Sequence, residues 1–180
     1  MQLHPVVSLA RLLTGRLFGN MMKLDEAINI MKEEAMGVKV LFTGPAVEID
    51  GVKYHHHPNG SGLVAETAFV AETAYIGPFA KICGNARVAD EAFVFGNAWV
   101  FDNAEVCDNA QVFANAKVFG NAKICGNAKV YGFSSVFGNA KISDYAEVCE
   151  FAEVSGNATV HLTTKVSGKS KITGDALVGK

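Results

Sequence analysis

Aliphatic residues recur at every sixth position from residue 64 to residue 178, without a slip in register. The unit is plainest between Gly120 and Val130, where Gly-Asn-Ala-Lys is followed first by Ile and then by Val. A small residue, usually Ala, stands two places before each aliphatic one. A period of six fits neither a helix nor a long alternating strand, so each unit is predicted to be a short strand followed by a turn. The aliphatic positions are Val64, Val70, Ile76, Ile82, Val88, Val94, Val100, Val106, Val112, Val118, Ile124, Val130, Val136, Ile142, Val148, Val154, Val160, Val166, Ile172 and Val178.

The most frequent unit, A-x-V-x-G-N, predicts which side chains point inward. Ala and Val lie two residues apart and therefore share one face of an extended strand, while the residues marked x point outward. Gly enters positive φ freely and Asn tolerates it better than most residues, so the Gly-Asn pair is expected at a sharp corner. Three sides of six residues close a triangular coil of eighteen residues, and the coils are expected to stack by parallel strand pairing.

On this pattern, residues 62–180 resemble the hexapeptide-repeat, left-handed parallel β-helix family. The resemblance covers about two-thirds of the chain. It implies an all-β solenoid, a left-handed parallel β-helix of about 20 hexads in six to seven triangular coils. At roughly 4.8 Å between paired strands the solenoid would be about 30 Å long. The resemblance also implies a homotrimer, and the monotonous repeats are similar to hexapeptide proteins of bacteria and their phages.

Three segments are predicted: a basic amphipathic segment at 1–21, a small α+β cap with its linker at 22–61, and the β-helix at 62–180. For the first segment three interpretations remain open: a docking helix, a disordered basic arm, or sequence upstream of a true start at Met21 or Met22. An apolar stripe predicts a helix over Lys23–Met36, and Val38–Phe42 is typical of a strand.

A β-hairpin is predicted around Asp50-Gly51, because this pair is a strong signal for a two-residue turn. Helix and hairpin are expected to cover the open edge of the first coil. His55, His56 and His57 follow as a polar linker. At most His55 and His57 can point the same way from an extended chain, and no further ligand stands nearby at metal-ligand spacing.

Aromatic residues gather at the outward positions of two neighbouring sides of the predicted prism. Exposed rings in such a row would form a larger apolar patch than monomers usually carry, so we expect them to be the contact surface of a homotrimer. The alternative is that the rings only stack on one another as a surface ladder. The predicted interface residues are Phe93, Phe95, Trp99, Phe101, Phe113, Phe119, Tyr131 and Phe137.

Two further columns follow from the eighteen-residue coil. The first is an amide ladder at one corner, interpreted as structural, whose members are Asn85, Asn103, Asn121, Asn139 and Asn157. In the second, Cys107 and Cys125 are neighbours on consecutive coils, close enough in principle for a disulfide, although reduced thiols are the preferred interpretation. Cys83 and Cys149 lie on other sides, so no four-cysteine metal site is expected, and no metal site is predicted.

Composition limits the choice of partners. The net charge of -2 gives no electrostatic basis for nucleic-acid binding. No apolar run is long enough to span a membrane, and we expect a cytoplasmic protein without membrane attachment. No cofactor is predicted unless the chain is an enzyme.

Many members of the hexapeptide-repeat family are acyltransferases that use acetyl-CoA or an acylated carrier protein, with a His as general base. Among the repeats, His161 alone offers this group, and no acidic partner is evident beside it in the sequence. The coils also carry no inserted loop to build an acceptor pocket. The favoured hypothesis is therefore a non-catalytic trimeric scaffold that binds a protein or a small ligand, a host protein if the chain is phage-encoded. The alternative is an acyl-CoA-dependent acyltransferase with His161 as general base.

Overall fold

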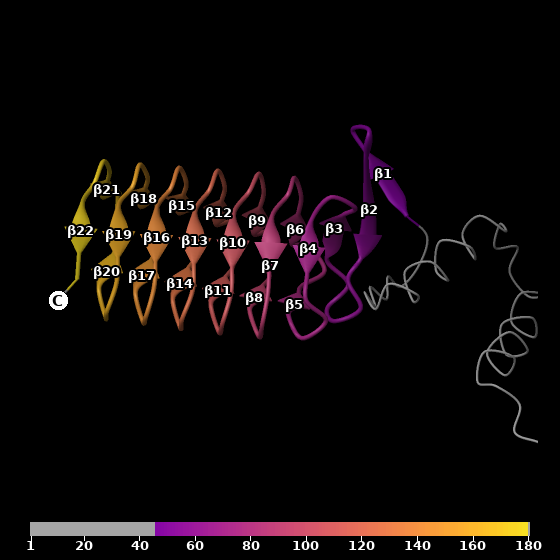
Figure 1. Cartoon of the computed structure of the whole chain (residues 1–180), viewed down its shortest axis with the longest axis horizontal. Coiled ribbons are helices and arrows are strands. Elements are labelled where there is room, and N and C mark those ends of the chain that lie inside the picture. Colours follow the sequence, from indigo (N-terminus) through magenta and orange to yellow (C-terminus); the bar gives the residue numbers. More distant parts are fainter. Residues whose placement is uncertain (1–45, 180) are drawn as a thin grey trace, which may run out of the picture. The chain divides into compact units, whose positions relative to one another are not determined.

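The structure, a computed structural model, describes residues 46–179. Within this range the chain is all-β, with short strands separated by turns (Figure 1). The prediction of an all-β parallel solenoid is confirmed. The basic segment 1–21, the Lys23–Met36 helix and the Val38–Phe42 strand lie outside the described residues. In residues 46–179, no helix is long and apolar enough to cross a membrane.

The strands form three sheets, and each sheet takes every third strand of the solenoid. Sheet A contains β1 (Val47–Ile49), β2 (Val52–His56), β3 (Leu63–Ala65), β6 (Lys81–Ile82), β9 (Trp99–Val100), β12 (Lys117–Val118), β15 (Ser135–Val136), β18 (Glu153–Val154) and β21 (Lys171–Ile172). Sheet B contains β4 (Phe69–Val70), β7 (Arg87–Val88), β10 (Glu105–Val106), β13 (Lys123–Ile124), β16 (Lys141–Ile142), β19 (Thr159–Val160) and β22 (Leu177–Val178). Sheet C contains β5 (Tyr75–Ile76), β8 (Phe93–Val94), β11 (Gln111–Val112), β14 (Lys129–Val130), β17 (Glu147–Val148) and β20 (Lys165–Val166).

Strand pairing confirms the eighteen-residue coil. Val118 pairs in parallel with Val100 of the preceding coil and with Val136 of the following one. The same offset holds in the other two sheets, for example between Val106 and Ile124 in sheet B. Each outward side chain therefore lies beside the residue eighteen positions away, so chemistry on the surface is arranged in columns.

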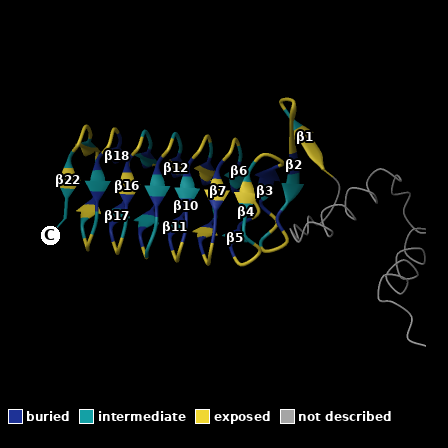
Figure 2. Cartoon of the chain, viewed as in Figure 1, coloured by how far each residue is buried: buried dark blue, intermediate teal, exposed yellow. Residues whose placement is uncertain are grey.

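The core is the column of Ala and aliphatic residues that the sequence predicts. Every Ala and aliphatic residue of this pattern from Ala74 to Val130 is at most 1% exposed, and together they form one continuous cluster. Where Ser134 replaces Ala, its hydroxyl donates to the carbonyl of Tyr131 at 2.8 Å, so the buried oxygen is satisfied. Figure 2 shows buried strand residues alternating with exposed corners along the solenoid.

The corners turn at the position that Gly occupies in the repeat. Gly84, Gly120 and Gly138 have φ values of 64°, 69° and 70°. A Cβ on Gly156 would lie 2.7 Å from the backbone nitrogen of Gly174, so these corners also pack closely on one another. The Asn of the Gly-Asn pair does not take positive φ in the described coils. Only the first residue of the pair makes the bend.

Several corners place an acidic residue in the same positive-φ conformation, among them Asp102 and Asp108, both at 58°. The side chain explains this choice, because it accepts a backbone hydrogen bond from the next coil. Asp102 Oδ2 accepts the Gly120 N–H at 3.1 Å, and Asp108 Oδ2 accepts the Gly126 N–H at 2.8 Å. Asp is tolerant of this conformation because its short polar side chain bonds locally.

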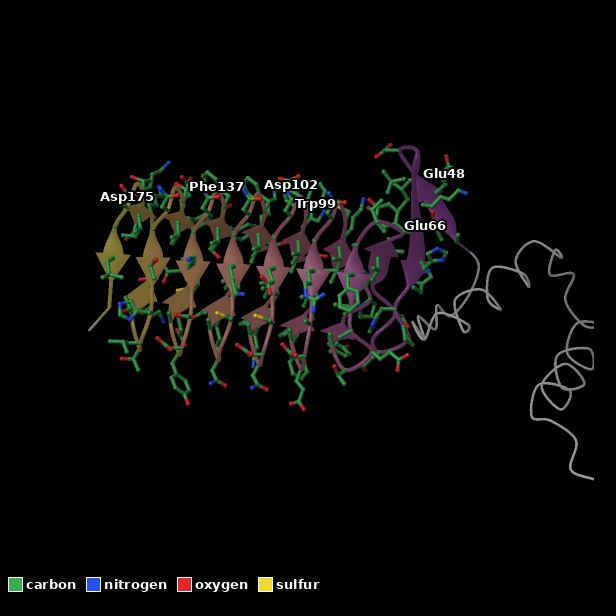
Figure 3. All side chains as sticks on the ribbon, viewed as in Figure 1. Glu48, Glu66, Trp99, Asp102, Phe137 and Asp175 are labelled. Carbon is green, nitrogen blue, oxygen red and sulfur yellow. The ribbon has the colours of Figure 1, made fainter. Side chains whose placement is uncertain are left out.

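The predicted amide ladder is present and continues for one more coil. The Asn103 amide donates to Asn121 Oδ1 at 3.2 Å, and the Asn121 amide donates to Asn139 Oδ1 at 3.1 Å. The series ends where the Asn157 amide donates to Asp175 Oδ1 at 2.8 Å. Figure 3 labels Asp102 and Asp175 along this edge of the solenoid. The hydrogen bonds of the amide ladder join successive coils, as expected for a structural element.

The predicted hairpin is β1 and β2, which pair antiparallel around Asp50 and Gly51. Strand β2 extends through His56 and pairs antiparallel with β3, so the hairpin continues sheet A and covers its first parallel strand. The sequence interpretation of His55 and His56 as a linker is therefore wrong. Both belong to the strand, and only His57 lies in the connection.

Candidate functional site

Two parallel ladders of aromatic rings run along the outer faces of sheets A and C. On sheet A, Phe101, Phe119 and Phe137 stack with ring centroids 4.8 Å apart and planes within 5°. On sheet C, the rings of Phe95, Phe113 and Tyr131 have centroids 4.9 Å apart and planes within 2°. Stacking uses the faces of the rings, so mainly ring edges remain for other contacts.

Burial differs among the eight predicted interface residues. Phe93 and Trp99 are 42% and 37% exposed, whereas the six rings of the two ladders are half-buried. Trp99 leans on Phe101 with centroids 4.7 Å apart and donates its indole N–H to Cys83 Sγ at 3.1 Å. Surface stacking, the alternative drawn from the sequence, therefore describes the six ladder rings. A role of all eight residues in assembly stays a prediction.

More exposed aromatic rings stand at the corners, where the sequence interpretation expected Asn. Phe133 and Phe151 are 61% and 58% exposed, and they follow consecutive strands β14 and β17 of sheet C. Their rings stack with centroids 5.4 Å apart. The sequence analysis missed them because it took aromatic residues only from the positions directly before and after the aliphatic residue, and not from the corner. An aromatic residue in the place of Asn was the signal that could have found them.

We use the name aromatic edge for the sheet C ladder together with these corner rings. Tyr131 and Phe133 lie on the same coil, two residues apart, so the corner pair starts where the ladder ends. The aromatic edge thus follows one corner of the solenoid over several coils. Its members are Phe95, Phe113, Tyr131, Phe133 and Phe151.

His161, the candidate general base, lies on sheet B near an acidic residue after all. Its Nδ1 is 4.0 Å from Asp144 Oδ2, and the same oxygen accepts the Leu162 N–H at 2.9 Å. The sequence showed no partner because Asp144 is one coil away. This separation suits an ion pair when the imidazole is protonated and is too long for a hydrogen bond.

An open hollow of about 320 Å³ lies near His161, lined by Thr164, Leu177, Val178 and Gly179. Gly179 packs against the imidazole, since a Cβ at this position would lie 2.4 Å from His161 Nε2. Leu177 is 74% exposed. The hollow is shallow and mostly apolar, and the structure describes no cationic side chain in its lining.

The predicted neighbours Cys107 and Cys125 do share a column on sheet B, and both are free thiols. Their sulfur atoms and a carboxylate oxygen of Asp108 all lie within 4.8 Å of one another. Burial raises the pKa of the Cys107 thiol to about 12, and burial also raises the pKa of the Cys125 thiol. Both groups are therefore protonated at neutral pH. Sequence reasoning counted cysteines alone and missed the carboxylate beside them.

Charged side chains on the outer faces of sheets B and C are paired between neighbouring coils. Lys123 Nζ lies 3.1 Å from Glu105 Oε2, and this hydrogen bond raises the pKa of the lysine. On sheet C, the Tyr131 hydroxyl donates to Glu147 Oε2 at 3.1 Å, and Lys165 Nζ lies 3.5 Å from the same oxygen. These pairs join neighbouring coils and neutralise charge on the surface.

The three consecutive histidines have separate partners. His55 Nε2 lies 3.2 Å from Glu66 Oε1, while His56 Nδ1–H donates to the Ser61 carbonyl at 2.8 Å. His57 is 3% exposed, and its Nδ1 accepts the Asn59 N–H at 3.3 Å. The histidines hold the connection between hairpin and solenoid.

Fold and surface together define the class of protein: a parallel β-solenoid with triangular coils and aromatic ladders on two faces. In comparisons with known proteins, the chain matches no family model, no curated protein and no solved structure at a significant level. The hexapeptide-repeat family is thus a resemblance in the repeat and in the coil geometry.

Proposed function

We propose that this chain is a non-catalytic scaffold that assembles into a homotrimer through the aromatic edge and binds a protein or small-ligand partner. If the chain is phage-encoded, the partner is a host protein. The observation that carries the proposal is the exposed pair Phe133 and Phe151, which stack on each other at the corner that follows sheet C. An exposed apolar edge that runs over several coils is a suitable contact for identical copies around one axis.

The aromatic edge is the part of the surface where contact with a partner would bury exposed aromatic rings. Monomeric proteins seldom expose contiguous apolar patches beyond a few hundred Å². Phe133 and Phe151 already contact each other through their ring faces. The outer edges of both rings remain exposed to water. Another copy offers the same rings at the same spacing, and edge-to-face contacts between aromatic rings are favourable.

The test compares two positions of similar exposure at different corners. Phe133→Glu combined with Phe151→Glu places charges in the proposed contact, and charge burial without a partner is strongly unfavourable. Tyr145, 64% exposed at the corner after sheet B, is the matched control as Tyr145→Glu. Native mass spectrometry should give a trimer for the wild-type protein and for Tyr145→Glu, and a monomer for the double variant.

Phe113→Glu is the less informative variant, because Phe113 stacks on both Phe95 and Tyr131 and its loss would also disturb the coils. Circular dichroism of the double variant should match the wild type, since both replaced rings are mostly exposed. A wild-type monomer, or a double variant that keeps the wild-type mass, would reject assembly through the aromatic edge.

A second candidate function rests on the approach of Asp144 to His161 beside the hollow. We infer that, in an acyl-CoA-dependent acyltransferase, Asp144 would orient the imidazole and His161 Nε2 would remove a proton from the acceptor. The test is binding of acetyl-CoA by calorimetry, followed by turnover of the wild-type protein and His161→Ala. Saturable binding with turnover lost in the variant would favour this function over the scaffold.

A further inference from the structure

Three potential metal ligands meet on the outer face of sheet B, independently of the aromatic edge. The sulfur atoms of Cys107 and Cys125 and a carboxylate oxygen of Asp108 lie within 4.8 Å of one another. Cys83 and Cys149, the remaining cysteines of the chain, follow strands of sheets A and C. The cluster therefore depends on the coil geometry and not on local spacing in the sequence.

Each ligand is positioned by the repeat. Cys107 and Cys125 directly follow Val106 and Ile124, which pair in neighbouring strands, so the two side chains leave the sheet side by side. Asp108 is at the corner with φ of 58°, and its Oδ2 is held at 2.8 Å by the Gly126 N–H. Such a backbone hydrogen bond orients a ligating carboxylate in the way that outer-shell contacts do in metal sites.

We propose that Cys107, Cys125 and Asp108 bind a thiophilic divalent cation of the Zn²⁺ class, with solvent in a fourth position. Zinc accepts thiolate sulfur at about 2.3 Å and carboxylate oxygen at about 2.1 Å, usually in a tetrahedron. Tetrahedral ligand atoms are then about 3.5–3.8 Å apart, so the three groups need to close by no more than about 1 Å around the ion. The oxygen ligand favours Zn²⁺ over Cu(I), which prefers sulfur ligands alone.

One side of the cluster is open to solvent, and the lysine beside it is already paired. Asp108 is exposed, so the fourth position faces solvent, as in zinc sites that keep an open coordination position. The nearest cation in the neighbouring column, Lys123, is already paired with Glu105 at 3.1 Å. Metal binding displaces the thiol protons of both cysteines, and thiolates formed in this way supply the negative charge.

The experiment titrates the reduced full-length protein with Cd²⁺, a probe of zinc-thiolate sites, and follows the ultraviolet thiolate-to-metal absorption band. We expect saturation at one ion per chain and reversal of the band by Zn²⁺. Cys125→Ser should abolish the saturable band. Asp108→Asn keeps an oxygen for the Gly126 N–H but weakens coordination, and should lower the affinity about 10-fold or more.

The controls separate a metal site from an effect on folding. Cys125→Ser reproduces the residue found one coil later in the same column, Ser143, so the solenoid should tolerate it. Asp102→Asn changes an equivalent corner on sheet A, where Asp102 holds the Gly120 N–H, and should leave Cd²⁺ affinity unchanged. Cys83→Ser should also leave it unchanged. Absence of a saturable band in the wild type, or a full band in Cys125→Ser, would overturn the proposal.

Discussion

The interior and the outer surface of the solenoid follow different rules, although both repeat every eighteen residues. Inside, Ala and Val or Ile recur with almost no variation, and most are fully buried. Outside, sheets A and C carry aromatic ladders, whereas sheet B carries the adjacent thiols of Cys107 and Cys125 together with His161. The interior defines the fold, and the differences among the outer faces are where function is to be sought.

Packing explains why the interior varies so little. Each inward side chain contacts its counterpart one coil away, so a residue of another size would disturb the coils on both sides. Outward side chains face water or a neighbour in the same column, and their size is less constrained. Where they nevertheless form a pattern, as in the aromatic edge, the pattern needs another physical reason.

The largest contrast is expected between two adjacent residues of β12. Val118 is fully buried and Lys117 is exposed. Val118→Asp places a carboxylate without a partner in the core, which costs several kcal/mol and should prevent folding. Lys117→Asp should change the free energy of unfolding by less than about 0.5 kcal/mol. Circular dichroism of both purified variants tests this, and a folded Val118→Asp protein would contradict the described core.

Loss of one ladder ring should have a smaller effect. Phe119 stacks on both Phe101 and Phe137, so Phe119→Ala removes two aromatic contacts and should lower the free energy of unfolding by about 2 kcal/mol. Phe79 is 78% exposed, and Phe79→Ala serves as the control with little expected change. Denaturant unfolding at a fixed protein concentration measures both. Equal effects would show that the ladder adds no stability.

The amide ladder should contribute less again. Asn121 donates to Asn139 and accepts from Asn103, so Asn121→Ala removes two exposed hydrogen bonds and should cost about 1 kcal/mol. Asn127 occupies the equivalent position at the corner after sheet B, where the described coils form no amide ladder. Asn127→Ala should be nearly neutral in the same unfolding assay. An equal loss in the two variants would count against the ladder.

The smallest effect is expected to be stabilising. Ala114 has φ of 60° at a corner position that Gly96, Gly132 and Gly168 occupy in other coils. Ala114→Gly relieves about 1–2 kcal/mol of left-handed strain, partly offset by about 0.4–1 kcal/mol from the greater freedom of the unfolded chain. The free energy of unfolding should rise by about 0.5 kcal/mol. Ala116→Gly, two residues away in the core, should instead lower it.

Sequence reasoning succeeded where a property depends on periodicity. It predicted the parallel solenoid, the inward Ala and aliphatic columns, the amide ladder from Asn85 to Asn157, and the hairpin at Asp50-Gly51. It failed where a contact joins two residues of neighbouring coils that occupy different positions in the repeat. The contacts of Asp144 with His161 and of Asp108 with the cysteines were missed. The distance between a corner residue and a residue that follows a strand depends on how the corner bends, and the repeat does not give that bend.

The sequence by itself determined that each coil has three sides and eighteen residues. It also determined which residues share a column, because a repeat without insertions allows one register only. Tertiary structure decided how those columns interact. It showed that the predicted interface rings mostly stack on one another, that Phe133 and Phe151 are the more exposed pair, and that two thiols share their surroundings with a carboxylate. The physical reason is that side-chain direction and burial at a corner depend on backbone angles and on the next coil, and neither is encoded in the six-residue period.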